Sequence, residues 1–254
     1  MVETFESLFE KTKKNGPKKI AVAVAQDEDV LGAVKLAYEN KIVDPILVGD
    51  EEKIREIAKE LNFDLSNIEV IDEKDGSLAA RKATELVSSG KACVLMKGLI
   101  DTSIIMKQVL DHEIGLRTGN VISHIALFEV PTYHKMFIVT DAAMLIAPDL
   151  NQKKGIVENA VSISHKLGVE TPKVAVLAAK EKVSEKMEAT VHAKLLKEMN
   201  EREEIKGCIV DGPFALDNAV SKESARIKGI KSEVAGDADI LLVPDIEAGN
   251  ILYK

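Results

Sequence analysis

Three short segments of the chain combine glycine with polar residues that could bind an anion. They are Lys97-Gly98, Asp211-Gly212-Pro213, and Asp245 with Gly249-Asn250, and each follows an apolar run that favours a strand. In an open α/β sheet, ligands bind at the carboxyl ends of the strands. A glycine there lets backbone N–H groups approach an anion at the start of the next helix. Because turn glycines are common, each segment alone is weak evidence for anion binding. The three segments together predict an anion-binding site.

The first segment has the most donors for a phosphate group. Lys97 could place a cation beside the phosphate, or it could be a solvated lysine at a strand end. Thr102 and Ser103 could donate to phosphoryl oxygens, or they could only help to cap the next helix. One helical turn further on, Lys107 could supply a second cation or simply face solvent.

Further candidates lie outside this segment. Arg117 stands between two glycines, and its planar fork suits phosphate, although it could equally be a surface arginine. His124 lies in an apolar run, where it is either a core histidine or a substrate contact. Asp211 and Asp245 could orient a thiol or an amide, or could cap the helices that follow.

Several well-known motifs are missing. No G-x-x-x-x-G-K-[ST] sequence and no strand followed by G-x-G-x-x-G occurs, which argues against nucleotide hydrolysis and simple dinucleotide binding. No G-x-S-x-G elbow of the α/β-hydrolases occurs either. The histidines and the two cysteines lack metal-ligand spacing, so we predict no metal site. A metal-dependent oxidoreductase would need helix carboxylates that this chain does not offer.

The first half of the chain alternates short apolar runs with amphipathic segments. Strands are predicted at residues 19–25, 45–48, 68–71 and 92–96. Helices are predicted at residues 29–40, 51–61, 78–88 and 102–110. This alternation is typical of a parallel sheet built from right-handed crossovers.

The alternation of single strands and helices ends after residue 119. Two strands at 121–130 and 134–140 favour an antiparallel hairpin, and strands at 174–177, 208–210 and 240–243 extend the second sheet. Helices are predicted at 152–167 and 184–204. The second helix carries an apolar stripe that would pack on its own sheet or form a dimer interface. The stripe consists of Val183, Met187, Val191, Leu195 and Met199.

Together these patterns predict two α/β domains. Residues 1–117 form the first, with a mostly parallel sheet, and residues 118–254 form the second, with a mixed sheet and the expected dimer contact. The formal net charge is −8, aromatic residues make up 4% and tryptophan is absent, all of which argue against a nucleic-acid partner. The acidic start lacks an apolar leader and no run is long enough to span a bilayer. We therefore expect a cytoplasmic protein without a membrane partner.

Four motifs, in order along the chain, resemble the phosphate acetyl/butyryltransferase family. They are MKGLIDTS at 96–103, GLRTG at 115–119, GCIVDGPFALD at 207–217 and VAGDADILLVPDIEAGN at 234–250. The resemblance runs through essentially the whole chain. The pair Ser123-His124 and the wording DGPFALD look closer to the butyryl branch than to the acetyl branch.

The resemblance implies two α/β domains with a cleft between them, similar to the isocitrate and isopropylmalate dehydrogenases. Family members usually form dimers through the second domain, so a homodimer or a higher homo-oligomer is expected. They reversibly transfer a short-chain acyl group, butyryl or similar, between coenzyme A and inorganic phosphate. The transfer is a direct attack without a covalent enzyme intermediate and without metal. Acyl-CoA and phosphate are therefore the expected partners, with coenzyme A as a substrate rather than a cofactor.

One departure from the family concerns catalysis. In the family, a Ser-Arg pair and a nearby Asp, assigned to the transition state and to thiol deprotonation, lie on a segment that would follow Lys254. The resemblance therefore leaves the catalytic residues of this chain unassigned. It also keeps open a truncated or non-catalytic protein that binds acyl-CoA or acyl phosphate. A phosphate acetyltransferase is a further alternative.

Overall fold

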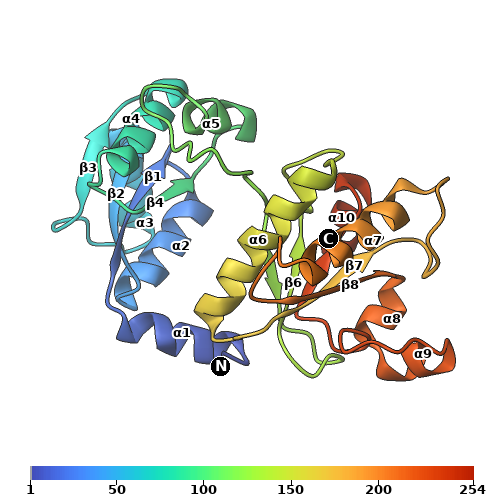
Figure 1. Cartoon of the computed structure of the whole chain (residues 1–254). Helices are drawn as coiled ribbons and strands as arrows, with labels where there is room; N and C mark the ends of the chain where they lie inside the picture. The colour runs from blue at the N-terminus through green and yellow to red at the C-terminus, as the bar shows by residue number, and fades with distance from the viewer. Residues whose placement is uncertain (1) are drawn as a thin grey trace. The chain divides into compact units, whose positions relative to one another are not determined.

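The computed structural model describes residues 2–254, which divide into two compact units (Figure 1). One unit is Phe9–Gly119, and the other combines residues 2–8 with Asn120–Lys254. Each unit has a sheet of its own with helices on both faces, so the predicted α/β class is confirmed. No helix within residues 2–254 is both long and apolar enough to cross a membrane.

The Phe9–Gly119 unit holds a four-stranded sheet in the order β3-β2-β1-β4, with every neighbouring pair parallel (Figure 1). The strands are β1 (Lys18–Ala23), β2 (Val43–Gly49), β3 (Glu69–Asp72) and β4 (Val94–Lys97). The helices are α2 (Glu28–Glu39), α3 (Glu51–Glu60), α4 (Gly76–Ser88) and α5 (Thr102–Val109), and helix α1 (Phe5–Lys14) has its first four residues in the other unit. The predicted strands and helices from residue 19 onward are confirmed to within a few residues, and α1 was not predicted.

Both faces of this sheet are buried, which explains why its strands lack polar alternation. Ile20, Val22 and Leu47 pack against α2 and α3. Ala21 and Val48 point to the opposite face and pack against α4. Successive side chains of a strand alternate between faces, so one strand contributes to both cores.

The order of the strands places a topological switch at β1. The chain runs from β1 through β2 to β3 and then returns to β4 on the other side of β1. In open α/β sheets, ligands bind outside the carboxyl ends of the strands at such a switch. The turn at Gly98 therefore begins at the edge of the sheet where a ligand is expected.

The second unit holds a five-stranded sheet in the order β5-β6-β9-β7-β8. Its strands are β5 (Ala126–Phe128), β6 (Phe137–Thr140), β7 (Lys173–Leu177), β8 (Ile209–Phe214) and β9 (Ile240–Leu242). Its helices are α6 (Leu150–Leu167), α7 (Glu188–Glu201), α8 (Leu216–Val220), α9 (Lys222–Ile227) and α10 (Ile246–Tyr253). Only β5 and β6 pair antiparallel, so the predicted hairpin and mixed sheet are confirmed, although both hairpin strands are shorter than predicted.

The predicted apolar stripe of the long helix was wrong. Helix α7 begins at Glu188, so residues 183–187 lie outside it and the spacing of four does not run along a single helix. The buried face consists of Thr190, Ala193 and Leu196, and the last two pack in the core beside Val210 of β8. The helix does pack on its own sheet, but its fully buried residues are not those of the stripe, of which Met199 packs partly buried against the same core.

At the amino end of β9, Asp237 contacts two neighbouring segments, the hairpin loop and the start of β7. Its carboxylate lies 2.6 Å from Lys173 Nζ, 2.6 Å from His134 Nε2 and 3.3 Å from Lys135 Nζ. Burial alone would raise the pKa of Asp237, but the hydrogen bonds from Lys173 and His134 and the nearby lysine charges hold the pKa well below its ordinary value. Asp237 therefore has a structural role: it holds the hairpin loop and the start of β7 together, and we call this group of contacts the Asp237 clamp.

We expect Asp237→Asn to lower the free energy of unfolding by about 2 kcal/mol, because the variant removes a charge that several partly buried cations share. Chemical denaturation near neutral pH measures the change. Asp44→Asn is the matched control, since Asp44 and Lys19 form an exposed pair whose loss should change stability by about 0.5 kcal/mol or less. Equal losses in both variants would contradict the clamp.

The pH dependence of this stabilisation follows from the direction of the pKa shift. The folded pKa of Asp237 lies below its unfolded value, which is about 3.9. The stabilisation is therefore fully present above the unfolded pKa and is lost as the pH falls toward the folded pKa. The difference in stability between the wild-type chain and Asp237→Asn should shrink when denaturation is repeated below about pH 4.

Candidate functional site

In the Phe9–Gly119 unit, the turn after β4 brings the chain against the end of β1. Gly98 N–H donates to Ala23 O at 2.8 Å, and Leu99 N–H donates to Val24 O at 3.0 Å. A Cβ atom at position 98 would lie 2.5 Å from Ala23 O and even closer to Val24 O. Only glycine fits this approach, so Gly98 is required by the backbone whether or not a ligand binds.

Val24, next to this turn, has an unusual backbone conformation that the sequence did not reveal. Its φ is +56°, in the left-handed region that β-branched residues rarely adopt. Strained backbone of this kind concentrates at ligand and active sites. Val24 therefore joins Gly98 as a candidate for the ligand edge of this sheet.

The predicted cations and hydroxyls of this unit are exposed. Lys97 Nζ donates to Ile100 O at 2.8 Å and to Gly98 O at 3.3 Å, so its side chain folds over its own turn. Thr102 and Ser103 are exposed at the start of α5, and Lys107 is exposed near its end. Asp101 occupies the N-cap position of α5 without a side-chain capping bond, which leaves the start of the helix accessible.

Arg117 lies in the loop that follows α5. Its Nη1 atom is 3.2 Å from both ring nitrogens of His112, and the side chain is exposed. The side chain of Arg117 thus contacts a neighbouring loop residue rather than another predicted site residue.

In the second unit, Gly249 and Asn250 lie inside α10, so this glycine is not at the start of the helix where the sequence analysis expected an anion to approach. Asp245 is the N-cap of this helix and accepts from Ala248 N–H at 2.9 Å. A Cβ atom on Gly249 would lie 2.7 Å from Val243 Cγ2 and 2.9 Å from Ala142 Cα. Asp245 therefore starts helix α10, and the absence of a side chain at Gly249 lets the helix pack closely against the end of β9 and the loop that begins at Ala142.

Asp141 organises this loop and was missed by the sequence analysis. It follows β6 directly and is 2% exposed. Its two carboxylate oxygens accept from the backbone N–H groups of Ala143, Met144 and Leu145 at 2.9–3.1 Å. Asn250 Nδ2 donates to Ala142 O at 3.3 Å, so the same loop supports α10. An acidic residue directly after a buried strand was the available clue.

His124 lies at the same end of the second sheet. Thr140 Oγ1 donates to its backbone oxygen at 2.7 Å, and its ring packs edge-on against Tyr253 of α10, with ring centroids 5.2 Å apart. Its Nδ1 atom is buried and has no hydrogen-bond partner within residues 2–254. The structure thus gathers His124, Asp245 and Asn250 around the ends of β6 and β9.

The segment Asp211-Gly212-Pro213 differs from its prediction. It lies within β8, which continues to Phe214, rather than after the strand. An irregularity in pairing between Ala175 and Leu177 of β7 accommodates the longer strand. Asp211 pairs with Lys197 at 2.8 Å, and this hydrogen bond raises the pKa of the lysine.

Gly212 has a packing role within that strand. A Cβ atom there would lie 2.8 Å from Val176 O and 3.3 Å from Ala193 Cβ of α7. The close approach of α7 to the sheet explains the glycine without a ligand, and Pro213 beside it is buried. Any ligand role of these three residues stays a prediction.

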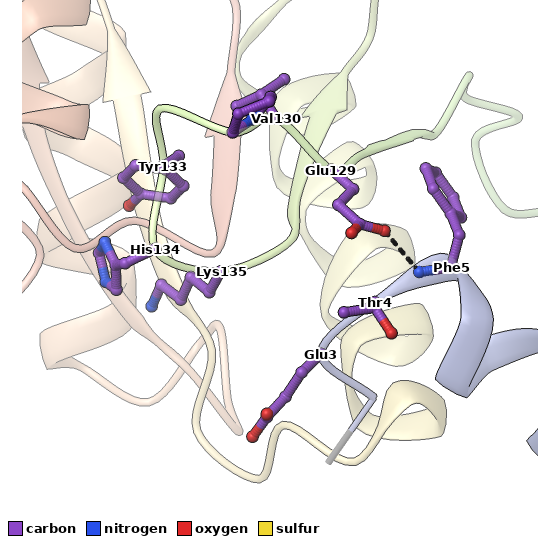
Figure 2. Close-up of a pocket in the computed structure, with 9 residues that line it drawn as sticks. Glu3, Thr4, Phe5, Glu129, Val130, Tyr133, His134 and Lys135 are labelled. Carbon is purple, nitrogen blue, oxygen red and sulfur yellow. Dashed lines mark hydrogen bonds between the residues drawn. The ribbon is translucent and has the colours of Figure 1, made fainter.

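A surface pocket of about 500 Å³ in the second unit involves none of the predicted site residues (Figure 2). It lies between the N-terminal segment and the hairpin loop, and Figure 2 shows Glu129 reaching across to Phe5, whose backbone N–H it accepts at 2.6 Å. His134 and Lys135 also line it, but both are engaged by Asp237. The pocket therefore marks the attachment of the N-terminal segment.

A family model described as "Phosphate acetyl/butaryl transferase" matches residues 3–81 and 77–254. The chain belongs to this family. It is 50% identical over 254 residues to a phosphate butyryltransferase of Clostridium beijerinckii, covering 100% of this chain and 84% of the relative. It is 48% identical over 249 residues to a phosphate acetyltransferase of Thermotoga maritima, covering 98% and 84%.

Solved structures agree with this assignment. A branched-chain phosphotransacylase from Enterococcus faecalis V583 superimposes with a TM-score of 0.76 at 31% identity, over 93% of this chain and 83% of that one. A structure described as a 4-hydroxythreonine-4-phosphate dehydrogenase from Salmonella typhimurium reaches 0.57 at 12% identity, over 92% and 83%. The second likeness concerns the fold alone, and it gives weak support to the predicted similarity to dehydrogenases.

Proposed function

We propose that the chain reversibly transfers a short-chain acyl group between coenzyme A and inorganic phosphate. The observation that carries the proposal is the 50% identity to a phosphate butyryltransferase across the whole chain. In one direction the coenzyme A thiolate attacks the carbonyl of an acyl phosphate and phosphate leaves. In the other direction phosphate attacks the thioester and the thiolate leaves. Neither direction requires a covalent enzyme intermediate or a cofactor.

The residues at the two sheet edges would serve this chemistry mainly by binding and alignment. Lys97, Thr102, Ser103, Lys107 and Arg117 are proposed donors for phosphate groups. Holding two reactants in line can account for about 7–11 kcal/mol of the reduction in barrier. His124, Asp245 and Asn250 are proposed to contact substrate at the second sheet, where the loop at Asp141 holds α10 in place.

The test is phosphate-dependent release of coenzyme A from butyryl-CoA, followed with a thiol reagent, with acetyl-CoA in parallel. Release with butyryl-CoA that needs phosphate supports the proposal. A preference for acetyl-CoA would favour the alternative, a phosphate acetyltransferase. The 48% identity to the Thermotoga maritima enzyme supports this alternative. Binding of coenzyme A without turnover of either thioester would contradict acyl transfer and favour a binding protein.

Three further features remain proposals. Residues 1–117 and 118–254 are proposed as the two domains, with homodimerisation through the second. The cytoplasm is proposed as the location, on the grounds of the sequence. Equilibrium sedimentation of the purified chain tests the dimer, because a single species of monomer mass would contradict it.

A further inference from the structure

Lys153 and His192 form a hydrogen-bonded pair at the carboxyl edge of the second sheet. Lys153 lies near the start of α6, which follows β6, and His192 lies near the start of α7, which follows β7. Lys153 Nζ is 3.0 Å from His192 Nδ1. A helix that follows a parallel strand begins at the carboxyl edge of the sheet, so the pair lies at the edge where ligands of α/β sheets bind.

The charge of Lys153 lacks a close counter-charge. The residue is only 4% exposed, and within residues 2–254 no carboxylate oxygen lies within 4.0 Å of its Nζ atom. Burial lowers its pKa, while the more distant charges of Glu188, Asp245 and Asp149 act in the opposite direction. The start of α6 adds the positive end of a helix dipole. A buried cation of this kind is destabilising unless something compensates it.

The contact also determines the protonation of the histidine. A charged lysine has three donors and no acceptor, so Lys153 must donate to Nδ1, and the imidazole proton then resides on Nε2. Burial and the charge of Lys153 both lower the pKa of His192, which keeps the ring neutral. Nε2 lies 3.9 Å from the nearest carboxylate oxygen, on the exposed Glu188, which is beyond hydrogen-bonding distance.

We propose that His192 donates a hydrogen bond from Nε2–H to an oxygen of a substrate phosphate group, and that Lys153 is the positioning residue that fixes this tautomer. The proposal rests on the proposed acyl transfer, which brings phosphate groups to this protein. A bound phosphate would supply the counter-charge that Lys153 lacks. The phosphate group could belong to inorganic phosphate and acyl phosphate, or to coenzyme A.

The kinetic test compares His192→Leu, His192→Gln and Lys153→Met with the wild-type chain. Hydrogen bonds to charged groups suggest a rise in KM of about 10- to 100-fold for His192→Leu. His192→Gln should recover part of the loss, because its amide nitrogen can donate from near the Nε2 position. A rise in the KM for phosphate identifies inorganic phosphate as the ligand. A rise in the KM for butyryl-CoA that disappears with butyryl-dephospho-CoA identifies coenzyme A.

Lys154→Met is the matched control, since Lys154 is the next residue of α6 and forms only a surface pair with Glu158. It should leave both KM values unchanged. Lys153→Met should shift KM in the same direction as His192→Leu without lowering the melting temperature, because it replaces a buried charge by an apolar chain of similar length. Unchanged KM values in the His192 and Lys153 variants, with the wild-type chain active, would overturn the inference and leave the proposed function intact.

Nuclear magnetic resonance of the chain with ¹⁵N-labelled histidine gives a readout that does not need turnover. The wild-type chain should show His192 as the Nε2–H tautomer, and Lys153→Met should show a mixture. Titration with inorganic phosphate or with coenzyme A should shift the His192 signals. An Nδ1–H tautomer in the wild-type chain, or no shift with either ligand, would refute the inference. Absence of turnover alone would count against the proposed function instead.

Discussion

Replacing Asp141 with alanine is expected to lower the free energy of unfolding by about 3–5 kcal/mol and to abolish acyl transfer. The reason is that one buried carboxylate accepts three backbone N–H groups of the loop after β6. Alanine would leave those groups without their acceptor in a site that is 2% exposed in the wild-type chain. Ala142 O in the same loop accepts a hydrogen bond from Asn250, so disorder of the loop should also loosen α10. Denaturation and the coenzyme A release assay measure the two effects.

Two variants make this prediction specific. Asp141→Asn keeps one carbonyl oxygen, which can retain the bonds from Ala143 and Met144, so its loss of stability should fall between those of the wild-type chain and the alanine variant. Asp64→Ala removes an exposed aspartate that bonds to Ser66 in a surface turn, and it should leave stability nearly unchanged. If Asp141→Ala behaves like Asp64→Ala, the loop does not depend on its carboxylate.

Replacing Gly98 with alanine should be comparably damaging, with a loss of about 3 kcal/mol or more. The added methyl group would meet the backbone oxygens of Ala23 and Val24, which no side-chain rotation can move away. Relief requires the end of β4 to separate from β1, which would break the bond from Gly98 N–H to Ala23 O. We expect acyl transfer to fall with the stability, since this turn carries Lys97.

Gly32→Ala is the appropriate comparison, because Gly32 lies inside α2 and a Cβ atom there would meet nothing within 4 Å. It should stabilise the chain by up to about 1 kcal/mol through helix propensity. Thermal denaturation of both variants side by side would reveal opposite signs. A neutral Gly98→Ala variant would show that β4 and β1 can part without loss.

The regular elements could be predicted from the sequence because each contains its own pattern. Sheet strands buried on both faces appear as short apolar runs, and Asp27, Asp50 and Asp75 cap the helices that follow them. The α7 stripe failed because its spacing of four began at residue 183, before the helix starts at Glu188. The end of β8 was missed because glycine and proline usually break a strand, and the pairing irregularity that tolerates them comes from β7.

The candidate site could be predicted only in part, because its supports are long-range contacts. The positions at the ends of β4 and β9 follow from the apolar runs, since Lys97 is the last residue of β4 and Asp245 lies shortly after β9. The loop geometry at Asp141, the strain at Val24 and the pair formed by Lys153 with His192 depend on contacts between segments distant in sequence. Such contacts leave no periodic pattern of apolar and polar residues in the local sequence. The substrate contacts proposed for His124 and Arg117 await their own tests.

The attachment of the N-terminal segment has a consequence for the order of folding. Val2 N–H donates to Leu167 O at 2.9 Å, and Phe5 N–H donates to Glu129, so residues 2–8 complete a unit whose other residues are synthesised more than a hundred positions later. On a ribosome, the Phe9–Gly119 unit can form its parallel sheet while residues 2–8 still lack their partners. Domains generally fold as they emerge, and pairings distant in sequence form late. Residues 2–8 are therefore expected to reach their native positions only after the Phe9–Gly119 unit has folded.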